Sequence, residues 1–387
     1  MLEIIEVTDK KTDKEWLNFG SEIYKNQKSF VPYIKQDISK VFDPKKNRAF
    51  KAGKAKRWIV KNEGVICGRI ASFIEHKYSK AMEQPTGGIG FFESIENKEV
   101  AFKLLDTAID WLKANDMEAV DGIVNFGEKN MFWGTLIENF TDQNTYGMNH
   151  HPPYYSEYLE EYGFQIYYNQ LVYFRDMHMP MQEVFQRKIN STDAEQKYSV
   201  TNCRGKSLEQ IGDDFLTVYN NAWGGHHGFA PMKRAQAQRT MKALKPIMDK
   251  DILIFAYEGD NPIGFYINIP ELNDIFKFVN GNLNLIGKLK FLYHQWKKTP
   301  NTMVGIVFGV DRAYHGKGIE AALIKYAAEN VVPMGHYNNT VMTWIGDFNP
   351  KMMKVCENLG ATVYRKLATH RYLFDREKEF KRAPSAK

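Results

Sequence analysis

The stretch Val310-Asp-Arg-Ala-Tyr-His-Gly-Lys-Gly-Ile-Glu-Ala-Ala-Leu-Ile324 decides how this sequence is interpreted. It follows the β-rich apolar run Met303–Val310 and leads into a helical pattern, so we expect a strand end, a loop and a helix start. Such a loop presents backbone N–H groups at the positive end of a helix, where phosphate binds favourably. Gly316 and Gly318 can adopt backbone angles that other residues avoid, which lets a bulky anion approach the main chain. The stretch therefore predicts a phosphate-bearing cofactor.

Two familiar nucleotide loops match this stretch poorly. A Walker loop requires Gly-Lys followed by Ser or Thr, whereas Lys317 is followed by Gly318. The dinucleotide fingerprint is formally matched from Gly316 to Ala321, but it lies in the last fifth of the chain. No acidic residue closes a second strand about 20 residues further on, where the ribose contact is needed. A Gly-Lys-Gly loop can also be a simple turn into a helix, so the surrounding sequence has to decide.

The sequence after the loop supplies this context. Beyond the first helical stretch, which ends near Val331, the pattern predicts a strand over Thr340–Ile345 and then a helix that Gly360 ends. A final pair of strands is predicted around Val363–Leu373. Strands that alternate with helices indicate an α/β protein.

At this point the chain resembles the GCN5-related N-acetyltransferases, abbreviated GNAT. That family has an Arg/Gln-x-x-Gly-x-Gly/Ala loop, which follows a strand and opens the helix that holds the pyrophosphate of coenzyme A. In this sequence the loop runs from His315 to Glu320. An asparagine at the start of the later helix, here Asn349, also belongs to the family pattern, as does an ending like Leu-Gly-Phe, here Leu359-Gly360-Ala361.

The resemblance implies acetyl-CoA or another acyl-CoA, bound between the strands that end near Val310 and Ile345. Transfer would be direct: an amine attacks the thioester, while a strand N–H near Val310 polarises the thioester carbonyl. The residues that the resemblance assigns to the cofactor are Val310, His315, Gly316, Lys317, Gly318, Ile319 and Asn349. We therefore expect an N-acyltransferase that acts on a small-molecule or peptide amine.

Three positions depart from the family pattern. His315 stands where Arg or Gln is usual, and Glu320 stands where a small residue is usual, so its carboxylate has to point away from the pyrophosphate. The family often has a tyrosine as general acid four residues before the helix-ending glycine, and this chain has Cys356 there. We take Cys356 as a candidate proton donor, with a buried and inert cysteine as the alternative. Asp347, after the second strand, is the candidate acceptor of the amine proton, directly or through water.

Two pairs of adjacent histidines are further candidates. His226 and His227 lie in Gly224–Phe229, after a helix that Ser207 begins with a capping box. We include His227 as a catalytic base or acceptor contact, with a simple glycine-rich turn as the structural alternative. The second pair, in Asn149–Tyr155, has no carboxylate at ligand spacing. There we predict no metal site and expect a wall of the acceptor cleft or of an interface between halves.

A repeat predicts two related halves. Gly68 and Gly264 lie 196 positions apart in similar strand-turn-strand patterns, and Gly163 and Gly360 lie 197 positions apart at similar helix ends. Coincidence of common turn glycines is the alternative. We divide the chain into residues 1–180 and 197–387, two tandem GNAT-like domains whose mixed sheets are flanked by helices. The first has no glycine loop, so we expect it to be a degenerate copy and the second to bind acyl-CoA.

Stretches along the whole chain, such as Gly90–Ser94 and Pro152–Tyr155, resemble a bacterial family of double acetyltransferase-like proteins. Two alternatives to an N-acyltransferase remain open. One is a non-catalytic ligand-binding or interaction protein that keeps the fold, since the usual tyrosine is absent. The other is an aminoacyl or peptidyl transferase, because such enzymes also use paired halves of this fold.

Composition narrows the class of protein. The chain has 387 residues, of which 43% are hydrophobic and 25% charged, as in globular proteins long enough for two domains. The net charge of +6 is spread widely, so we predict no nucleic-acid partner. Three scattered cysteines, an N-terminus unlike a signal peptide and the lack of a long apolar run predict a cytoplasmic protein without a membrane span.

The segment Asn282–Pro300 is inserted where a plain acetyltransferase has only a strand hairpin. Leu285, Leu289 and Leu292 recur in it at helical spacing, and four lysines lie alongside them. A basic amphipathic helix can lie on a membrane surface. Packing on its own domain is the more common arrangement, and we expect that arrangement here.

Overall fold

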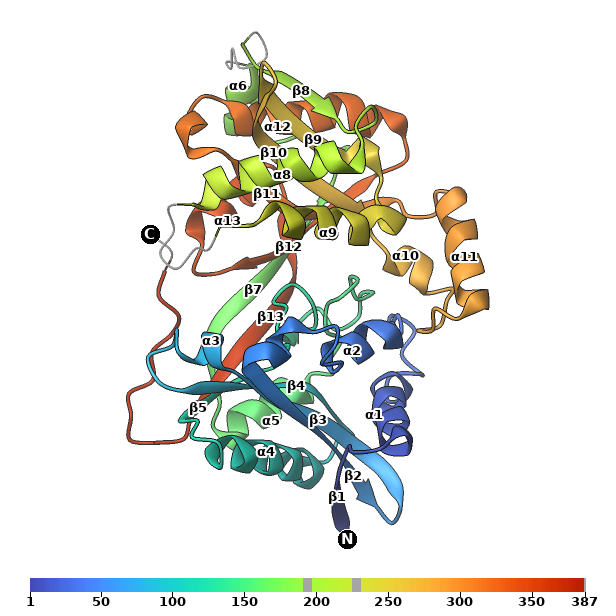
Figure 1. The fold of residues 1–387 in the computed structure, drawn as a ribbon, viewed down its shortest axis with the longest axis vertical. Coiled ribbons are helices and arrows are strands. Elements are labelled where there is room, and N and C mark those ends of the chain that lie inside the picture. Colours follow the sequence, from blue (N-terminus) through green and yellow to red (C-terminus); the bar gives the residue numbers. More distant parts are fainter. Residues whose placement is uncertain (191–196, 225–230, 386–387) are drawn as a thin grey trace.

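The computed structural model describes residues 1–190, 197–224 and 231–385. Its strands form one continuous mixed sheet of thirteen strands, with helices packed against the sheet (Figure 1). Along the sheet the order is β1-β2-β3-β4-β5-β13-β7-β12-β11-β10-β9-β8, and β6 pairs with β13 beside this path. The expected α/β class is therefore confirmed.

The lower half of Figure 1 comes from the N-terminal part of the chain. Its strands are β1 Leu2–Glu6, β2 Gly53–Asn62, β3 Val65–Glu75, β4 Thr86–Ser94, β5 Ala119–Gly122 and β6 Thr135–Glu138. Its helices are α1 Lys10–Glu22, α2 Lys35–Val41, α3 His76–Ser79, α4 Lys98–Lys113 and α5 Tyr154–Tyr162. The apolar residues of α4 recur at helical spacing and are buried against β2, β3 and β4, which makes this face of the sheet a hydrophobic core.

The upper half repeats this plan. Its strands are β8 Ser199–Asn202, β9 Leu253–Glu258, β10 Asn261–Pro270, β11 Thr302–Val310 and β12 Asn339–Gly346. Its helices are α6 Glu183–Asn190, α8 Leu208–Trp223, α9 Arg234–Leu244, α10 Asn273–Phe276, α11 Leu285–Trp296, α12 Ile319–Tyr326 and α13 Pro350–Asn358. Helix α12 takes the place of α4, and it packs on β9 and β10 through Ile319, Ala322 and Leu323.

The last strand of each half crosses into the sheet of the other half. Strand β7, Gln165–Asp176, pairs with β12 of the C-terminal half, and strand β13, Thr362–Leu373, pairs with β5 of the N-terminal half. The two crossing strands also pair with each other, antiparallel, at the centre of the sheet (Figure 1). The halves are thus joined by exchanged strands and not only by a linker.

Strand β13 corrects one expectation. A pair of strands was predicted around Val363–Leu373, and the structure has one strand of 12 residues, Thr362–Leu373. The segment contains no Gly, Pro, Asn or Asp to form a hairpin turn, so it stays extended through its whole length.

The glycines that revealed the repeat occupy equivalent places. Gly68 lies on β3 and Gly264 on β10, the second strand of each central hairpin. Gly163 ends α5 with a φ of 110°, and Gly360 follows α13 with a φ of 77°. Both helices end in the left-handed conformation that glycine adopts most easily, and each leads into a crossing strand.

Candidate functional site

The central strands of the C-terminal half diverge. Strand β11 pairs in parallel with β12 only over Thr302–Gly305, opposite Asn339–Met342. Beyond this point β11 continues to Val310 with β10 on one side, while β12 continues beside β7. The edge of β11 that faces β12 therefore has no strand partner after Gly305 within the described ranges.

A β-bulge lies where the two strands separate. Opposite β10, Ile267 pairs with Val307 and Asn268 pairs with Gly305, so Ile306 is an extra residue on β11. A bulge of this kind bends the strand and leaves backbone groups outside the ladder. The side chain of Ile306 is 37% exposed although it lies on a central strand. Solvent therefore reaches the middle of the sheet at this point.

The side chains around Gly305 form the inner end of the site. A Cβ placed on Gly305 would lie 3.5 Å from Asn268 Oδ1, 3.7 Å from Tyr266 Cε2 and 3.8 Å from Met342 Cγ. Burial raises the pKa of the Tyr266 hydroxyl above its ordinary value, so the phenol keeps its proton at neutral pH. The strands thus bring the ring of a neutral tyrosine close to the bulge.

The glycine loop has the geometry that its sequence predicts. Gly316 and Gly318 have φ angles of 76° and 82°, and Gly318 is the N-cap residue of α12. In the described part of the chain no side chain caps this helix, so its first N–H groups remain available to a ligand. The N–H of Lys317 donates to the carbonyl of Tyr314 at 3.2 Å, and its ammonium lies 4.5 Å from the Tyr314 ring. Ile319 begins the helix and is buried.

The residues on either side of the loop fix its position. Val310 is buried and pairs with Gly264, while His315 is exposed and its Nε2 lies 3.1 Å from the Val310 carbonyl oxygen. This contact ties the loop to the strand end where the family has Arg or Gln. Glu320 is partly buried in the first turn of α12. Glu258, at the end of β9, accepts a hydrogen bond from the Tyr314 hydroxyl at 2.5 Å.

Asp347 and Asn349 lie after the end of β12, on the other side of the divergence. Asp347 Oδ2 accepts hydrogen bonds from Asn169 Nδ2 at 2.9 Å and from the Arg382 guanidinium at 2.6 Å. Asn349 is the N-cap residue of α13, and its side chain accepts from the Met352 N–H at 3.3 Å. Asn349 therefore holds the helix start, while Asp347 is the carboxylate on this side of the site.

Cys356 has an apolar environment. Its side chain is fully buried, and Sγ lies 3.6 Å from Met342 Sδ within a cluster that includes Leu171 and Tyr173. Burial raises the pKa of the thiol to about 12. These surroundings favour packing between α13 and the sheet over proton transfer.

Helix α8 supplies an aromatic wall on the opposite face of β11. Phe215, Tyr219 and Trp223 follow one another along the helix, and Phe265 of β10 stacks against Phe215 and Trp223. Two atoms of the Trp223 ring lie 2.7 and 2.8 Å from a Cβ placed on Gly309, so the ring rests directly on the β11 backbone. His227, predicted from sequence as a base or acceptor contact, lies outside the described residues, in the segment that follows this helix.

The N-terminal half has the same divergence, but its own chain fills the space. Strand β4 pairs in parallel with β5 only over Thr86–Gly88, yet all nine residues of β4 are buried. The N–H of Val124 donates to the Ile89 carbonyl at 2.8 Å, and a Cβ on Gly90 would lie 2.0 Å from the Val124 carbonyl oxygen. At the helix start, the side chain of Asn97 caps α4.

The second histidine pair packs against residues of the N-terminal half: His150 contacts Tyr24 and Phe30, and His151 contacts Tyr155. His150 and His151 are buried, and burial lowers their pKa values to about 4 and about 3, so both rings are neutral. His151 Nδ1 accepts from the Leu136 N–H at 3.3 Å. In the same loop, the carbonyl of Asn144 accepts from Asn273 Nδ2 of the C-terminal half at 2.6 Å. Within the described ranges no cluster of three or more His, Cys, Asp or Glu is placed to hold a metal ion.

The sequence pattern did not predict the bulge at Ile306 or the position of Tyr266. Glycines at 305 and 309, inside an otherwise apolar strand pattern, were the available signal, because glycine within a strand often marks a bulge or a close backbone approach. Tyr266 carries no local signal, since only strand pairing brings it to Gly305.

The sequence is similar to known proteins over most of its length. No protein-family model matches the sequence. The chain is 22% identical over 360 residues to Protein YghO of Escherichia coli (strain K12), covering 91% of this chain and 90% of the relative. It is 21% identical over 373 residues to the Bacterial ceramide synthase of Caulobacter vibrioides (strain NA1000 / CB15N), covering 94% of this chain and 95% of the relative.

Solved structures show the same fold. A tandem GNAT protein from the clavulanic acid biosynthesis pathway superposes with a TM-score of 0.54 at 11% identity, over 97% of this chain and 99% of its own. A GCN5-related glucosamine N-acetyltransferase region of a fungal multi-domain β-N-acetylglucosaminidase gives a TM-score of 0.55 at 10% identity, over 96% of this chain and 38% of its own. The chain therefore has the tandem GNAT fold expected from its loop and its repeat. No helix in the described part of the chain has the length and apolar character needed to cross a membrane.

Proposed function

We propose that the C-terminal half binds acyl-CoA between β11 and β12 and transfers the acyl group to an amine. The observation that carries this proposal is the contrast between the two halves. Strand β11 is accessible to solvent from Gly305 to Phe308, beside a helix start that no described side chain caps and that carries two left-handed glycines. Its counterpart β4 is wholly buried and leads to a helix that Asn97 caps. The N-terminal half would then serve as a scaffold without a cofactor.

The acyl-CoA supplies an activated thioester, and the residues of the chain hold and polarise it. The N–H groups of Gly316, Gly318 and Ile319 would bind the pyrophosphate at the positive end of α12, with the ammonium of Lys317 beside them. His315, through Val310, and the Asn349 cap would keep the loop and α13 in place. A backbone N–H freed by the bulge at Ile306 would polarise the thioester carbonyl.

Two protons have to move when the amine nitrogen bonds to the carbonyl carbon and the carbon–sulfur bond breaks. We assign the proton for the leaving thiolate to Tyr266, whose neutral phenol lies beside Gly305. The amine proton would pass through water to Asp347, whose Oδ1 has no hydrogen-bond partner among the described residues. Cys356 takes no part in this scheme.

The acceptor that fits best is an amine with a long apolar chain. In the aromatic wall, Phe215 and Phe265 are buried, while Tyr219 and Trp223 are partly exposed and offer an apolar surface to such a chain. A relative over most of the chain is named a bacterial ceramide synthase, and ceramides are N-acylated long-chain amino alcohols. Both observations favour a lipid-like amine over a short polar one.

Isothermal calorimetry with acetyl-CoA and with longer acyl-CoAs tests the first step. We expect saturable binding with one site per chain. If none of these ligands binds, the assignment of the site is wrong. Free-thiol release with short amines, peptides and long-chain amino alcohols then tests the transfer, and we expect turnover to rise with the length of the apolar chain. Binding without thiol release by any amine would favour the non-catalytic alternative.

The acceptor class is tested with Trp223→Ala. Removing this ring should raise the KM for a long-chain amine roughly tenfold, as expected for the loss of one large apolar contact, and leave the KM for a short amine unchanged. Phe102→Ala, on α4 of the other half, is the matched control and should change neither value. Equal effects of Trp223→Ala on both amines would argue against an apolar acceptor site at this wall.

A further inference from the structure

Helix α11, Leu285–Trp296, exposes an apolar face of unusual size. Six large apolar side chains on this helix are between 53% and 81% exposed: Leu285, Ile286, Leu289, Leu292, Tyr293 and Trp296. At about 100° of rotation per residue, Leu285, Leu289, Leu292 and Trp296 fall within about 60° of one another, with Ile286 and Tyr293 beside them. The sequence led us to expect that this face packs on its own domain, but the structure turns it to solvent.

The opposite face anchors the helix. Gly287 and Phe291 are its buried residues, and Phe291 belongs to a cluster with Phe276 of α10 and with Val31 and Ile34 of the N-terminal half. The Asn284 side chain caps the helix start, and Gln295 Nε2 donates to the Pro246 carbonyl at 2.7 Å. The exposed face is thus held on a fixed support and is not the side of a loose segment.

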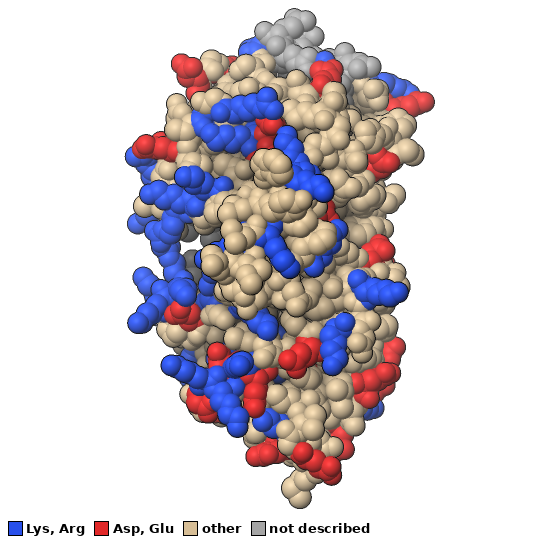
Figure 2. All heavy atoms as spheres, turned by 90° about the vertical axis from the view of Figure 1, so that its right-hand side faces the viewer, with Lys and Arg blue, Asp and Glu red and all other residues tan. Residues whose placement is uncertain are grey.

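Lysines border the apolar face on both sides. Lys288 lies on one flank of the stripe, and Lys290 and Lys297 lie on the other. None of these three, nor Lys298, forms an ion pair within the described ranges, and all four are exposed. Figure 2 views the molecule from the side on which Figure 1 places α11, and it shows Lys and Arg side chains around an uncharged area at mid-height.

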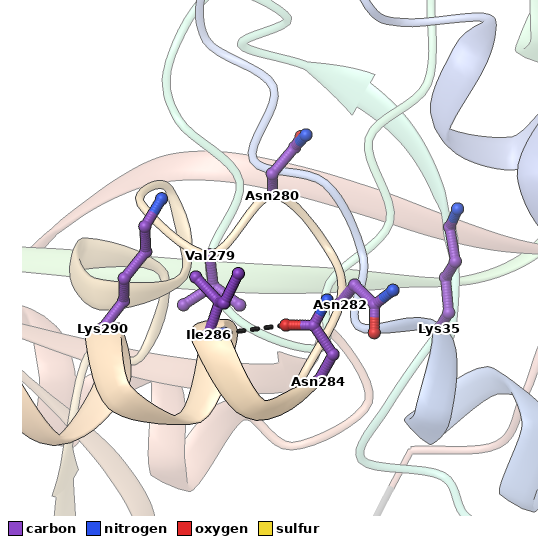
Figure 3. A pocket seen from close by; sticks show the side chains of 8 residues that line it. Lys35, Val279, Asn280, Asn282, Asn284, Ile286 and Lys290 are labelled. Atoms are coloured by element: carbon purple, nitrogen blue, oxygen red, sulfur yellow. Dashed lines mark hydrogen bonds between the residues drawn. The ribbon is translucent and has the colours of Figure 1, made fainter.

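A hollow with a mixed polar and apolar lining adjoins the start of the same helix. It has a volume of about 340 Å³, and its lining includes Lys35 of α2, Ile286 and Lys290 of α11, and Val279, Asn280, Asn282 and Asn284 of the connecting segment (Figure 3). The Lys35 ammonium donates to Asn18 Oδ1 at 2.6 Å, so it is held near the hollow. The hollow therefore adds amide groups and positive charge beside the apolar stripe.

We propose that α11 docks on an anionic lipid surface, with its Leu and Trp stripe at the boundary between headgroups and acyl chains and its lysines on the lipid phosphates. An apolar stripe with lysines on both flanks is the pattern of helices that lie in a membrane interface. A second copy of the chain fits less well, because a two-fold contact through this face would bring the same lysines together on molecules that each carry a net charge of +6. This docking does not depend on acyl-CoA binding.

Sedimentation of the full-length protein with vesicles tests the proposal. We expect binding to vesicles of phosphatidylglycerol and phosphatidylcholine, weaker binding at high salt, and little binding to phosphatidylcholine alone. Leu289→Gln combined with Trp296→Gln, and separately Lys290→Glu combined with Lys297→Glu, should each lower the partition coefficient at least roughly tenfold. Val65→Gln and Lys103→Glu, exposed residues far along the chain, are the matched controls and should bind like the wild type.

Three further results decide between a lipid surface and other partners. Trp296→Phe should bind vesicles but lose part of the blue shift in fluorescence that the wild type shows on binding, because this indole is 81% exposed in free protein. Each variant should keep the wild-type melting temperature and its affinity for acyl-CoA. The proposal is overturned if the wild type ignores anionic vesicles, or if light scattering finds a dimer that the Leu289 and Trp296 changes dissociate.

Discussion

At the position where the family has a tyrosine, this chain has Cys356, which is enclosed by Met342 and the apolar residues around it. Tyr266 approaches Gly305 from a different strand, β10. In the proposed scheme the proton donor therefore lies on a strand and not on the helix. We base this assignment on the position of the Tyr266 ring beside the bulge and on the apolar surroundings of Cys356, where a thiol with a pKa of about 12 is a weak acid.

Substitution of Tyr266 by Phe tests whether Tyr266 or Cys356 donates the proton to the leaving thiolate. It keeps the ring against Phe308 and removes only the hydroxyl, so we expect kcat to fall about a hundredfold with an unchanged affinity for acyl-CoA. Cys356→Ala is the comparison: it should keep kcat within about twofold and lower the free energy of unfolding by about 1–2 kcal/mol, because it leaves a small void. Steady-state kinetics and urea unfolding measure both effects, and the reverse pattern would restore Cys356 as the donor.

Glu271, directly after β10, is a buried carboxyl that links the halves. Its Oε1 accepts from the N–H groups of Tyr146 and Asn273, both at 2.9 Å, while Oε2 has no hydrogen-bond partner in the described part of the chain. Burial raises the pKa of this carboxyl from 4.5 to about 8. Between these two pH values the unfolded chain has released a proton that the folded chain still holds, so stability falls as pH rises through this window.

Glu271→Gln should remove this pH dependence. The amide resembles the protonated carboxyl, so the variant should match the wild type near pH 5 and exceed it above pH 8, by a free energy of unfolding on the order of 2–4 kcal/mol. Urea unfolding from pH 5 to pH 9 measures the difference. Glu3→Gln, at an exposed position on β1, should give a curve parallel to that of the wild type. Parallel curves for Glu271→Gln as well would show that this carboxyl is ionised in the folded protein.

At the scale of elements, the glycine loop combines a left-handed backbone with open space. Gly316 has a φ of 76°, and a Cβ placed on it meets no atom of the described residues within 4 Å. The hairpin glycine between β9 and β10, Gly259, has a φ of 59° and equally open surroundings, but it lies in a turn without a helix start. The two glycines therefore share their backbone requirement and differ in the proposed ligand.

Substituting valine at each of the two glycines separates the effect on the backbone from the effect on ligand binding. Gly316→Val and Gly259→Val should each lower the free energy of unfolding by about 1–2 kcal/mol, the cost of a left-handed angle for a residue with a Cβ. Only Gly316→Val should also weaken acyl-CoA binding, by at least about tenfold, because the side chain and the altered backbone obstruct the anion. Calorimetry measures the affinity of both variants for acyl-CoA. Equal affinities would show that the pyrophosphate does not bind at this loop.

The sequence predicted those elements whose signals are local. The loop from Gly316 to Gly318, the helix end at Gly360 and the capping box at Ser207 each depend on a few neighbouring residues, and all are present in the structure. The bulge at Ile306 and the approach of Tyr266 depend on the register between β10 and β11. Such pairings join distant segments, so a single sequence leaves them undetermined. The side of α11 that faces solvent is likewise set by contacts with distant parts of the chain.

For the molecule as a whole, the exchange of strands makes the intact chain, and not each half, the unit of folding. Strand β7 leaves the N-terminal half to pair with β12, and β13 returns from the C-terminal half to pair with β5. Val172 of β7, and Leu367 and Ala368 of β13, are buried by these pairings. Each half therefore buries apolar side chains that the other half supplies, and we expect the intact chain to unfold in one cooperative step.

Fragments test this interdependence. Residues 1–180 lack β13, so β5 keeps an open edge, and residues 197–387 lack β7, so β12 does the same. An unpaired central strand exposes backbone groups and apolar surface, so neither fragment should give a native near-ultraviolet circular dichroism spectrum alone. Mixed during refolding, the two fragments together should recover that spectrum and acyl-CoA binding, because they supply nearly all paired strands. If residues 197–387 fold alone and bind acyl-CoA with the affinity of the intact chain, then the crossing strands are dispensable and the halves are independent domains.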